Sequence, residues 1–180
     1  MAVQFAPFEP LPDLVLGLVG PIGVDLGYIS QALSDSLVSY NYESEHIQLT
    51  QLMQELVSDK KIDSSNVALS YSSKIDYAND LRRKYKANDI LAAIAVGAIK
   101  NRRSQIIQLD GRKQCGRAFI IRQFKTPEEI RLMRSVYGKN FIQISIYGSQ
   151  KKREEFLISR MKLKSKAPEP MRCPATVQGI

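Results

Sequence analysis

Apolar residues along this chain fall into short continuous runs separated by longer stretches with helical periodicity. Four runs are short and apolar enough to be strands of a buried parallel sheet, and they cover residues 13–19, 42–49, 118–122 and 141–147. The second run is the weakest, because Glu43, Glu45 and His46 interrupt it. Strands that alternate with helical segments predict an α/β fold with a parallel sheet covered by helices on both faces.

The stretches with helical periodicity differ in how many of their sides are apolar. The first places one apolar stripe toward a core, formed by Leu26, Ile29, Leu33 and Leu37. Residues 90–99, which Asn88 or Asp89 can cap, are almost entirely apolar, and this indicates a helix packed on several sides. Further helices are expected over residues 51–57, 75–85 and 149–161. The polar, serine-rich residues 59–73 are expected to form an exposed loop, and Asp110-Gly111 a turn.

The clearest helix start lies in the second half of the chain, at Thr126-Pro127-Glu128-Glu129. Threonine is a good N-cap, proline fits the first helical position, and acidic side chains are favoured in the first turn. We expect this helix to run to about Tyr137 and to end at Gly138.

Between the first strand and the first helix, eight residues resemble a phosphate-binding loop that has lost its reactive side chains. They read Gly20-Pro21-Ile22-Gly23-Val24-Asp25-Leu26-Gly27. A P-loop has glycine, any four residues, glycine, lysine, and then serine or threonine. Counted from Gly20, the last three places hold Asp25, Leu26 and Gly27; counted from Gly17, they hold Ile22, Gly23 and Val24. Neither register supplies the lysine that neutralises phosphates or the hydroxyl that holds magnesium.

Asp25 decides how this turn would behave toward an anion. Free N–H groups at a helix N-terminus favour anions, but a carboxylate in that place can itself accept those N–H bonds as an N-cap. We therefore expect Asp25 to cap the helix that begins near Leu26 and to repel a triphosphate. Two interpretations of the turn stay open. It is either a degenerate P-loop or a tight strand-to-helix turn of an ordinary α/β domain.

The composition is that of a globular domain and excludes some classes of protein. A chain of 180 residues, of which 44% are apolar, can form one domain with a substantial core. No apolar run reaches the roughly 18 residues of a membrane span, and the first residues lack the pattern of a secretory signal. Cys115 and Cys173 stand in unrelated contexts without metal-ligand spacing. We expect a cytoplasmic protein that has no membrane partner.

The net charge of +8 is concentrated toward the C-terminus, where five cations from Arg160 onward stand against Glu169 alone. The rest of the chain is mildly basic, and a solvated surface explains this at least as well as a nucleic-acid site. We divide the chain into a domain over residues 1–161 and a basic, proline-containing tail over residues 162–180, which we expect to be disordered.

A bound nucleotide would place its phosphates over the glycine turn, within reach of several cations. Arginine suits phosphate because its planar fork makes paired hydrogen bonds, and open α/β sheets bind ligands at the carboxyl ends of their strands. The predicted nucleotide-binding residues are Gly20, Pro21, Ile22, Gly23, Val24, Asp25, Leu26, Arg82, Arg102, Arg103, Arg122 and Lys125. Structural alternatives stay open, since Arg82 can belong to a solvated helix face and Arg122 and Lys125 can pair with Glu128 or Glu129.

No catalytic residue and no metal ligand is assigned. The acids that could serve as a magnesium ligand in the manner of a Walker B motif are Asp76, Asp80, Asp89 and Asp110. None of the four ends a hydrophobic strand.

In this order, the elements resemble the N-terminal P-loop kinase-like domain of the bacterial anti-phage dCTP deaminases, of the deoxycytidylate deaminase family. The likeness is carried by residues 16–23, 80–82, 90–92, 99–103, 119–129 and 136–147. Residues 122–129 together with Tyr137-Gly138 are its more specific part, because P-loops alone are common. Nucleoside monophosphate kinases are broader relatives. The resemblance implies a three-layer α/β/α fold of the P-loop NTPase or nucleoside-monophosphate-kinase type, with a mainly parallel sheet.

In that family a zinc-dependent deaminase domain follows, with His-x-Glu and Pro-Cys-x-x-Cys motifs that supply zinc-activated water and a proton-shuttling glutamate. Neither motif is present here, since Ile47-Gln48 follows His46 and Pro174-Ala175-Thr176 follows Cys173. The chain therefore resembles a truncated member, and we expect no zinc on it. The ligand that the resemblance implies is a dNTP or NTP. The implied partners are a deaminase domain or partner chain and an inhibitory small RNA, and self-association is compatible with the sequence.

Three functions follow from these observations. The leading one is a catalytically inactive nucleotide-binding or regulatory module, related to proteins that defend against phage by nucleotide depletion. An active nucleoside monophosphate kinase is the second, although loss of the motif lysine removes transition-state stabilisation. The third is an interaction module with a vestigial pocket, in which replacing Gly20 or Gly23 harms folding but changes no ligand affinity.

Overall fold

The computed structural model describes residues 11–56, 66–110 and 115–165, and within these ranges it has one four-stranded sheet. The strands are β1 (Leu14–Val19), β2 (Tyr42–Gln48), β3 (Gly116–Arg122) and β4 (Phe141–Ser145). All neighbours run parallel in the order β2-β3-β1-β4, with Leu16 of β1 paired to Ile120 of β3 and to Ile142 of β4. The expected α/β class with a parallel sheet is confirmed.

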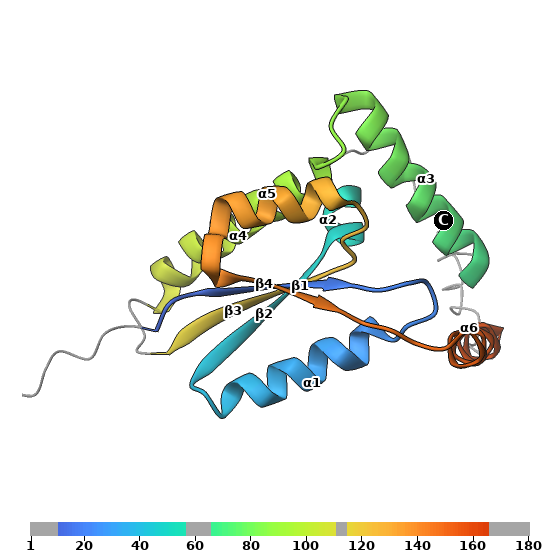
Figure 1. Ribbon diagram of the computed structural model, residues 1–180, viewed down its shortest axis with the longest axis horizontal. Coiled ribbons are helices and arrows are strands. Elements are labelled where there is room, and N and C mark those ends of the chain that lie inside the picture. The colour runs from blue at the N-terminus through green and yellow to red at the C-terminus, as the bar shows by residue number, and fades with distance from the viewer. Residues whose placement is uncertain (1–10, 57–65, 111–114, 166–180) are drawn as a thin grey trace, which may run out of the picture.

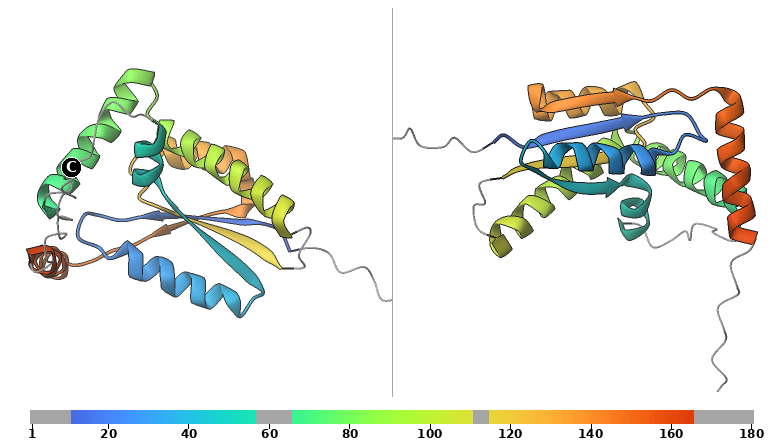
Figure 2. Two further views of the ribbon diagram at one scale, coloured as in Figure 1. Left: turned by 180° about the vertical axis from the view of Figure 1, so that it is seen from behind. Right: turned by 90° about the horizontal axis from the view of Figure 1, so that it is seen from below.

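Helices flank this sheet on both faces (Figure 1). They are α1 (Leu26–Val38), α2 (Leu49–Leu56), α3 (Val67–Tyr85), α4 (Ile90–Asp110), α5 (Pro127–Tyr137) and α6 (Gln150–Ser165), with a short 3-10 turn, η1 (Gly138–Asn140). Helix α1 covers one face, and α2, α4 and α5 cover the other. Helices α3 and α6 lie beyond the carboxyl ends of the strands, where two further views show them close to each other (Figure 2).

The two faces of β1 and β3 build two separate cores, because successive strand side chains point to opposite faces. Leu16, Leu18 and Ile120 pack against the apolar stripe that α1 presents, as the sequence predicted. Val15 and Phe119 face the other way, into a larger core that includes the buried sides of α2, α4 and α5. The central strands β1 and β3 are buried along most of their length and are mainly apolar, whereas the outer strands β2 and β4 are more exposed and carry polar residues.

The predicted start and end of α5 are confirmed. The Thr126 hydroxyl accepts the Glu129 N–H at 3.3 Å, and the Glu129 carboxylate accepts the Thr126 N–H at 3.1 Å, which completes a capping box. Gly138 follows the helix with a φ of +54°, a backbone conformation that glycine adopts without steric cost.

The expected loop over residues 59–73 is wrong for its second half, since α3 already begins at Val67. The Asn66 side chain caps this helix by accepting the Leu69 N–H at 2.8 Å. The buried side chains of the helix are Val67, Tyr77 and Leu81. Burial of these side chains outweighs the low helix propensity of the serines. Residues 57–65 lie outside the described ranges.

Several predicted boundaries also shift, and among these are the ends of α4 and α6. Helix α4 extends beyond residue 99 to Asp110, so Asp110 is helical, whereas Gly111 lies outside the described residues. Helix α6 continues to Ser165, past the expected domain end at residue 161, and residues 166–180 are outside the described part of the chain. Within the described ranges, every helix is too short or too polar to be a transmembrane segment.

Candidate functional site

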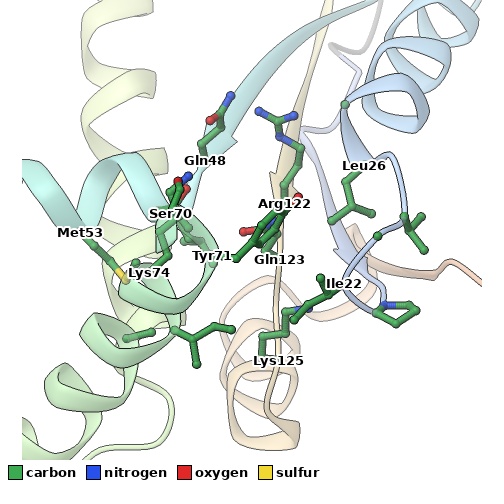
Figure 3. Close-up of a pocket in the computed structure, with 18 of the residues that line it drawn as sticks. Ile22, Leu26, Gln48, Met53, Ser70, Tyr71, Lys74, Arg122, Gln123 and Lys125 are labelled. Atoms are coloured by element: carbon green, nitrogen blue, oxygen red, sulfur yellow. The ribbon is translucent and has the colours of Figure 1, made fainter. Parts of the chain in front are cut away.

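A pocket of about 510 Å³ opens at the carboxyl end of the sheet, beside the glycine turn. The turn and the first residues of α1 form one wall, and α2 and α3 form the opposite wall (Figure 3). Between these walls lie Gln48 and Arg122, which end β2 and β3, and Gln123, which follows β3. Leu91 of α4 and Phe156 and Arg160 of α6 complete the described lining. Six separate segments of the described chain therefore meet in one cavity.

The glycine turn is held tightly between the sheet and α6. Gly23 has a φ of +89°, and a Cβ placed on it would lie 2.8 Å from both the Cβ and the carbonyl oxygen of Arg153. The Arg153 guanidinium donates to the carbonyl oxygens of Ile22 at 3.2 Å and Gly148 at 3.1 Å. Glycine at position 23 is therefore needed for both the backbone conformation and the close approach of α6.

Asp25 caps α1, as the sequence predicted. Its Oδ1 accepts the Tyr28 N–H at 3.0 Å. Among the described residues, no acceptor is found for the backbone N–H groups of Gly23 and Gly27. The helix start thus retains donors that an anion can use, although a carboxylate already lies beside them.

Arg122 brings a positive charge to this helix start from the end of β3. A Cβ on Gly27 would come within 3.4 Å of its Nη1, so the guanidinium lies against the first turn of α1. Burial lowers the pKa of Arg122, and the negative charge of Asp25 partly opposes this effect. Arg122 therefore faces both Asp25 and the pocket rather than Glu128 or Glu129, the partners considered from the sequence.

Lys125 supplies a second cation to the turn. Its ammonium group donates to the carbonyl oxygen of Gly20 at 2.7 Å. Burial lowers the pKa of Lys125, and the Glu129 carboxylate raises it in part. The backbone N–H of Lys125 donates to Glu129 at 2.6 Å, whereas Glu128 pairs with Arg131. Gly20 itself is not among the residues that line the cavity.

Arg82 lines the pocket but is engaged by a buried acid. Its Nη2 lies 2.6 Å from Oε1 of Glu129, a side chain with no exposed surface. Among the described residues, the Arg82 Nε is buried and has no hydrogen-bond partner. Its Nη1 also donates to Oδ1 of Asn79 at 3.1 Å, so Arg82 stabilises the wall between α3 and α5.

The structure does not bring Arg102 and Arg103 together with the turn. Arg103 pairs with Asp13, just before β1, at a distance of 2.7 Å. Its guanidinium also lies over the rings of Phe119 and Tyr137, 5.5 and 5.6 Å from their centroids. Arg102 pairs with Glu45 of β2 at 3.3 Å. Neither arginine lines the pocket, because α4 carries both toward the amino end of β1.

Sequence reasoning expected a helix over residues 75–85, beside which a base or sugar would lie, but it missed the first part of the wall that α3 contributes. The α3 residues that line the cavity recur at helical spacing and are Val67, Ser70, Tyr71, Lys74, Ile75, Ala78, Asn79 and Arg82. From this spacing the helix could have been predicted. A loop was expected over residues 59–73 instead, so the first part of the helix was overlooked. Phe156 and Arg160 carried no local signal, since only the packing of α6 brings them to the pocket.

The described residues offer little to a metal ion. They contain no group of three or more His, Cys, Asp or Glu side chains that could hold one. Asp80 pairs with Arg83, and Asp76 accepts from the Ser72 hydroxyl at 3.4 Å. Asp76, Asp80 and Asp89 do not line the pocket, and Asp25 is the one lining carboxylate within the described part of the chain.

Comparisons with known proteins add no assignment. No protein-family model matches this chain, and no curated protein matches it either.

Proposed function

We propose that this chain is a degenerate P-loop nucleotide-binding or regulatory module, related to the N-terminal half of the anti-phage dCTP deaminases. One observation carries the proposal. In the pocket, the backbone N–H groups of the glycine turn and of the start of α1 lie together with Arg122, which ends β3, and Lys125, which follows it. These two cations stand near the place where the motif lysine of a P-loop is missing.

The topology supports a ligand site at this position. From β1 the chain crosses by α1 on one face to reach β2, and from β3 it crosses by α5 on the other face to reach β4. Since β1 and β3 are neighbours, their connections diverge and leave a crevice outside their carboxyl ends. The glycine turn follows β1, and Arg122 ends β3. Open α/β sheets bind their ligands in such crevices.

The pocket chemistry fits a molecule that has an anionic and an apolar part. Its volume of about 510 Å³ lies within the usual range of small-molecule sites. Met53, Tyr71 and Ile75 offer an apolar wall for a base or sugar, opposite the basic side. A nucleotide combines these properties, with its phosphates at the turn and its base toward α3.

The test is isothermal titration calorimetry of the chain with dCTP, dATP, ATP and dCMP. Arg122→Gln should weaken binding about tenfold to a hundredfold, because a hydrogen bond to a charged group contributes about 1.5–3 kcal/mol. Arg134→Gln is a matched control: the same charge is removed from an exposed α5 side chain that bonds Gln143. Absence of binding for all four nucleotides would refute the proposal and favour the interaction module with a vestigial pocket.

Lys125 favours one further candidate, an active nucleoside monophosphate kinase. Its ammonium group lies at the turn, 2.7 Å from the Gly20 carbonyl oxygen, where it could neutralise a transferred phosphate. A coupled assay with ATP and dCMP, dGMP or dTMP decides this point. Turnover that disappears in Lys125→Met would support a kinase, and absence of turnover with intact nucleotide binding would support the regulatory module.

A further inference from the structure

Most of the charged side chains that line the described part of the pocket are cationic. The cationic lining residues are Lys74, Arg82, Arg122, Lys125 and Arg160. Among the residues that the structure describes, Asp25 is the one lining carboxylate, and Glu129 lies outside the lining, where it pairs with Arg82. The described lining is therefore basic even after Lys74 and the Arg82–Glu129 pair are set aside.

The single lining carboxylate is a poor anchor for a divalent cation. Mg²⁺ demands octahedral oxygen coordination and in phosphate sites is usually held by one or two carboxylates together with the substrate oxygens. Asp25 already accepts the Tyr28 N–H at 3.0 Å and faces the Arg122 guanidinium. A magnesium ion here would have to approach Arg122 and Lys125, whose charges repel it.

From this arrangement we propose that the pocket binds its ligand as the metal-free anion, with Arg122 and Lys125 as the counter-charge in place of Mg²⁺. The inference rests on the proposed function and specifies the charge state of its ligand. Complexation by Mg²⁺ removes two negative charges from a triphosphate, and it therefore weakens the attraction to the basic lining. The magnesium complex consequently binds less tightly than the free anion.

Asp25 has a defined part in this scheme. It stabilises α1 as an N-cap, but its charge lies on the side of the turn where the ligand anion would bind. Asparagine caps helices about as well as aspartate. Asp25→Asn therefore removes the negative charge and retains the cap. If Asp25 opposes the anion, this variant binds it more tightly; if Asp25 holds a metal, the variant binds it less tightly.

The experiment is calorimetric titration with dCTP in two buffers, one with EDTA and one with MgCl2 in excess over the nucleotide. The wild-type chain should bind dCTP about tenfold more tightly in EDTA. Asp25→Asn should increase the affinity in EDTA about threefold to tenfold. Asp35→Asn, an exposed carboxylate further along α1 that bonds Gln31, should leave the affinity in EDTA unchanged, which separates a local effect from a change of net charge.

Each outcome decides the question. Tighter binding in MgCl2, equal binding in both buffers, or a loss of affinity in Asp25→Asn would overturn the metal-free inference while the proposed function stands. No binding of dCTP in either buffer would overturn the inference as well. The proposed function fails with it only if dATP, ATP and dCMP also fail to bind.

Discussion

Replacing Gly23 by alanine tests whether the glycine turn is held by α6. Gly23 has a φ of +89°, and a left-handed backbone costs a residue with a Cβ about 1–2 kcal/mol. The new methyl group would also lie 2.8 Å from the Cβ and from the carbonyl oxygen of Arg153. One of these atoms is backbone, so α6 has to move, and overpacking of this kind costs about 1–3 kcal/mol. We expect a loss of about 2–5 kcal/mol in the free energy of unfolding.

Urea unfolding followed by circular dichroism measures this loss. Such a loss is a large part of the 5–15 kcal/mol typical of a folded domain. Gly97→Ala is the matched control, since Gly97 lies inside α4 and a Cβ there meets nothing within 4 Å. The control should gain about 0.5–1 kcal/mol from higher helix propensity. If Gly23→Ala unfolds within about 0.5 kcal/mol of the wild-type chain, the packing argument is wrong.

Three further substitutions test the surroundings of the site. Glu129→Ala leaves the Arg82 guanidinium without its carboxylate partner and should lower the free energy of unfolding by about 3–5 kcal/mol in urea; a loss below about 1 kcal/mol would contradict a buried pair. Burial raises the pKa of Tyr137 above its usual 10.0, so its contribution to stability is present below pH 10 and is lost as pH rises through the folded pKa. Thermal melts at alkaline pH should accordingly show a shallower decline for Tyr137→Phe, and an unchanged slope would refute this. Gly17→Ala places a methyl group 2.8 Å from the Phe141 ring and should cost about 1–3 kcal/mol in urea, whereas a neutral effect would show that the ring can move.

Local signals in the sequence were sufficient for much of the fold. The central strands β1 and β3 were predictable because strands buried on both faces form continuous apolar runs. Asp25 and Thr126 were predictable as helix caps, since a cap bonds N–H groups within three residues of itself. The start of α3 was not predictable in this way. Its serines favour a loop locally, and the burial of Tyr77 and Leu81 against distant elements overrides that preference.

The partners of the cations could not be predicted from local sequence. Arg82 pairs with Glu129, 47 positions away, and Arg103 pairs with Asp13, 90 positions away. Both pairs exist only because the sheet brings distant segments together. Arg122 and Lys125 were correctly placed at the end of a strand by the rule for parallel sheets. The contact of Lys125 with Gly20 spans 105 positions and emerges only from the fold.

The most direct test of the proposed site is an NMR titration that follows the glycine amides of the chain as dCTP is added. Glycine amides form a separate region of the ¹⁵N spectrum, and the chain has ten glycines. We predict that the amide signals of Gly23 and Gly27, which lie at the pocket, shift progressively. Those of Gly97 and Gly138, which lie outside its lining, should stay in place. Shifts confined to glycines outside the turn, or no shifts at all, would contradict an anion-binding role for this turn.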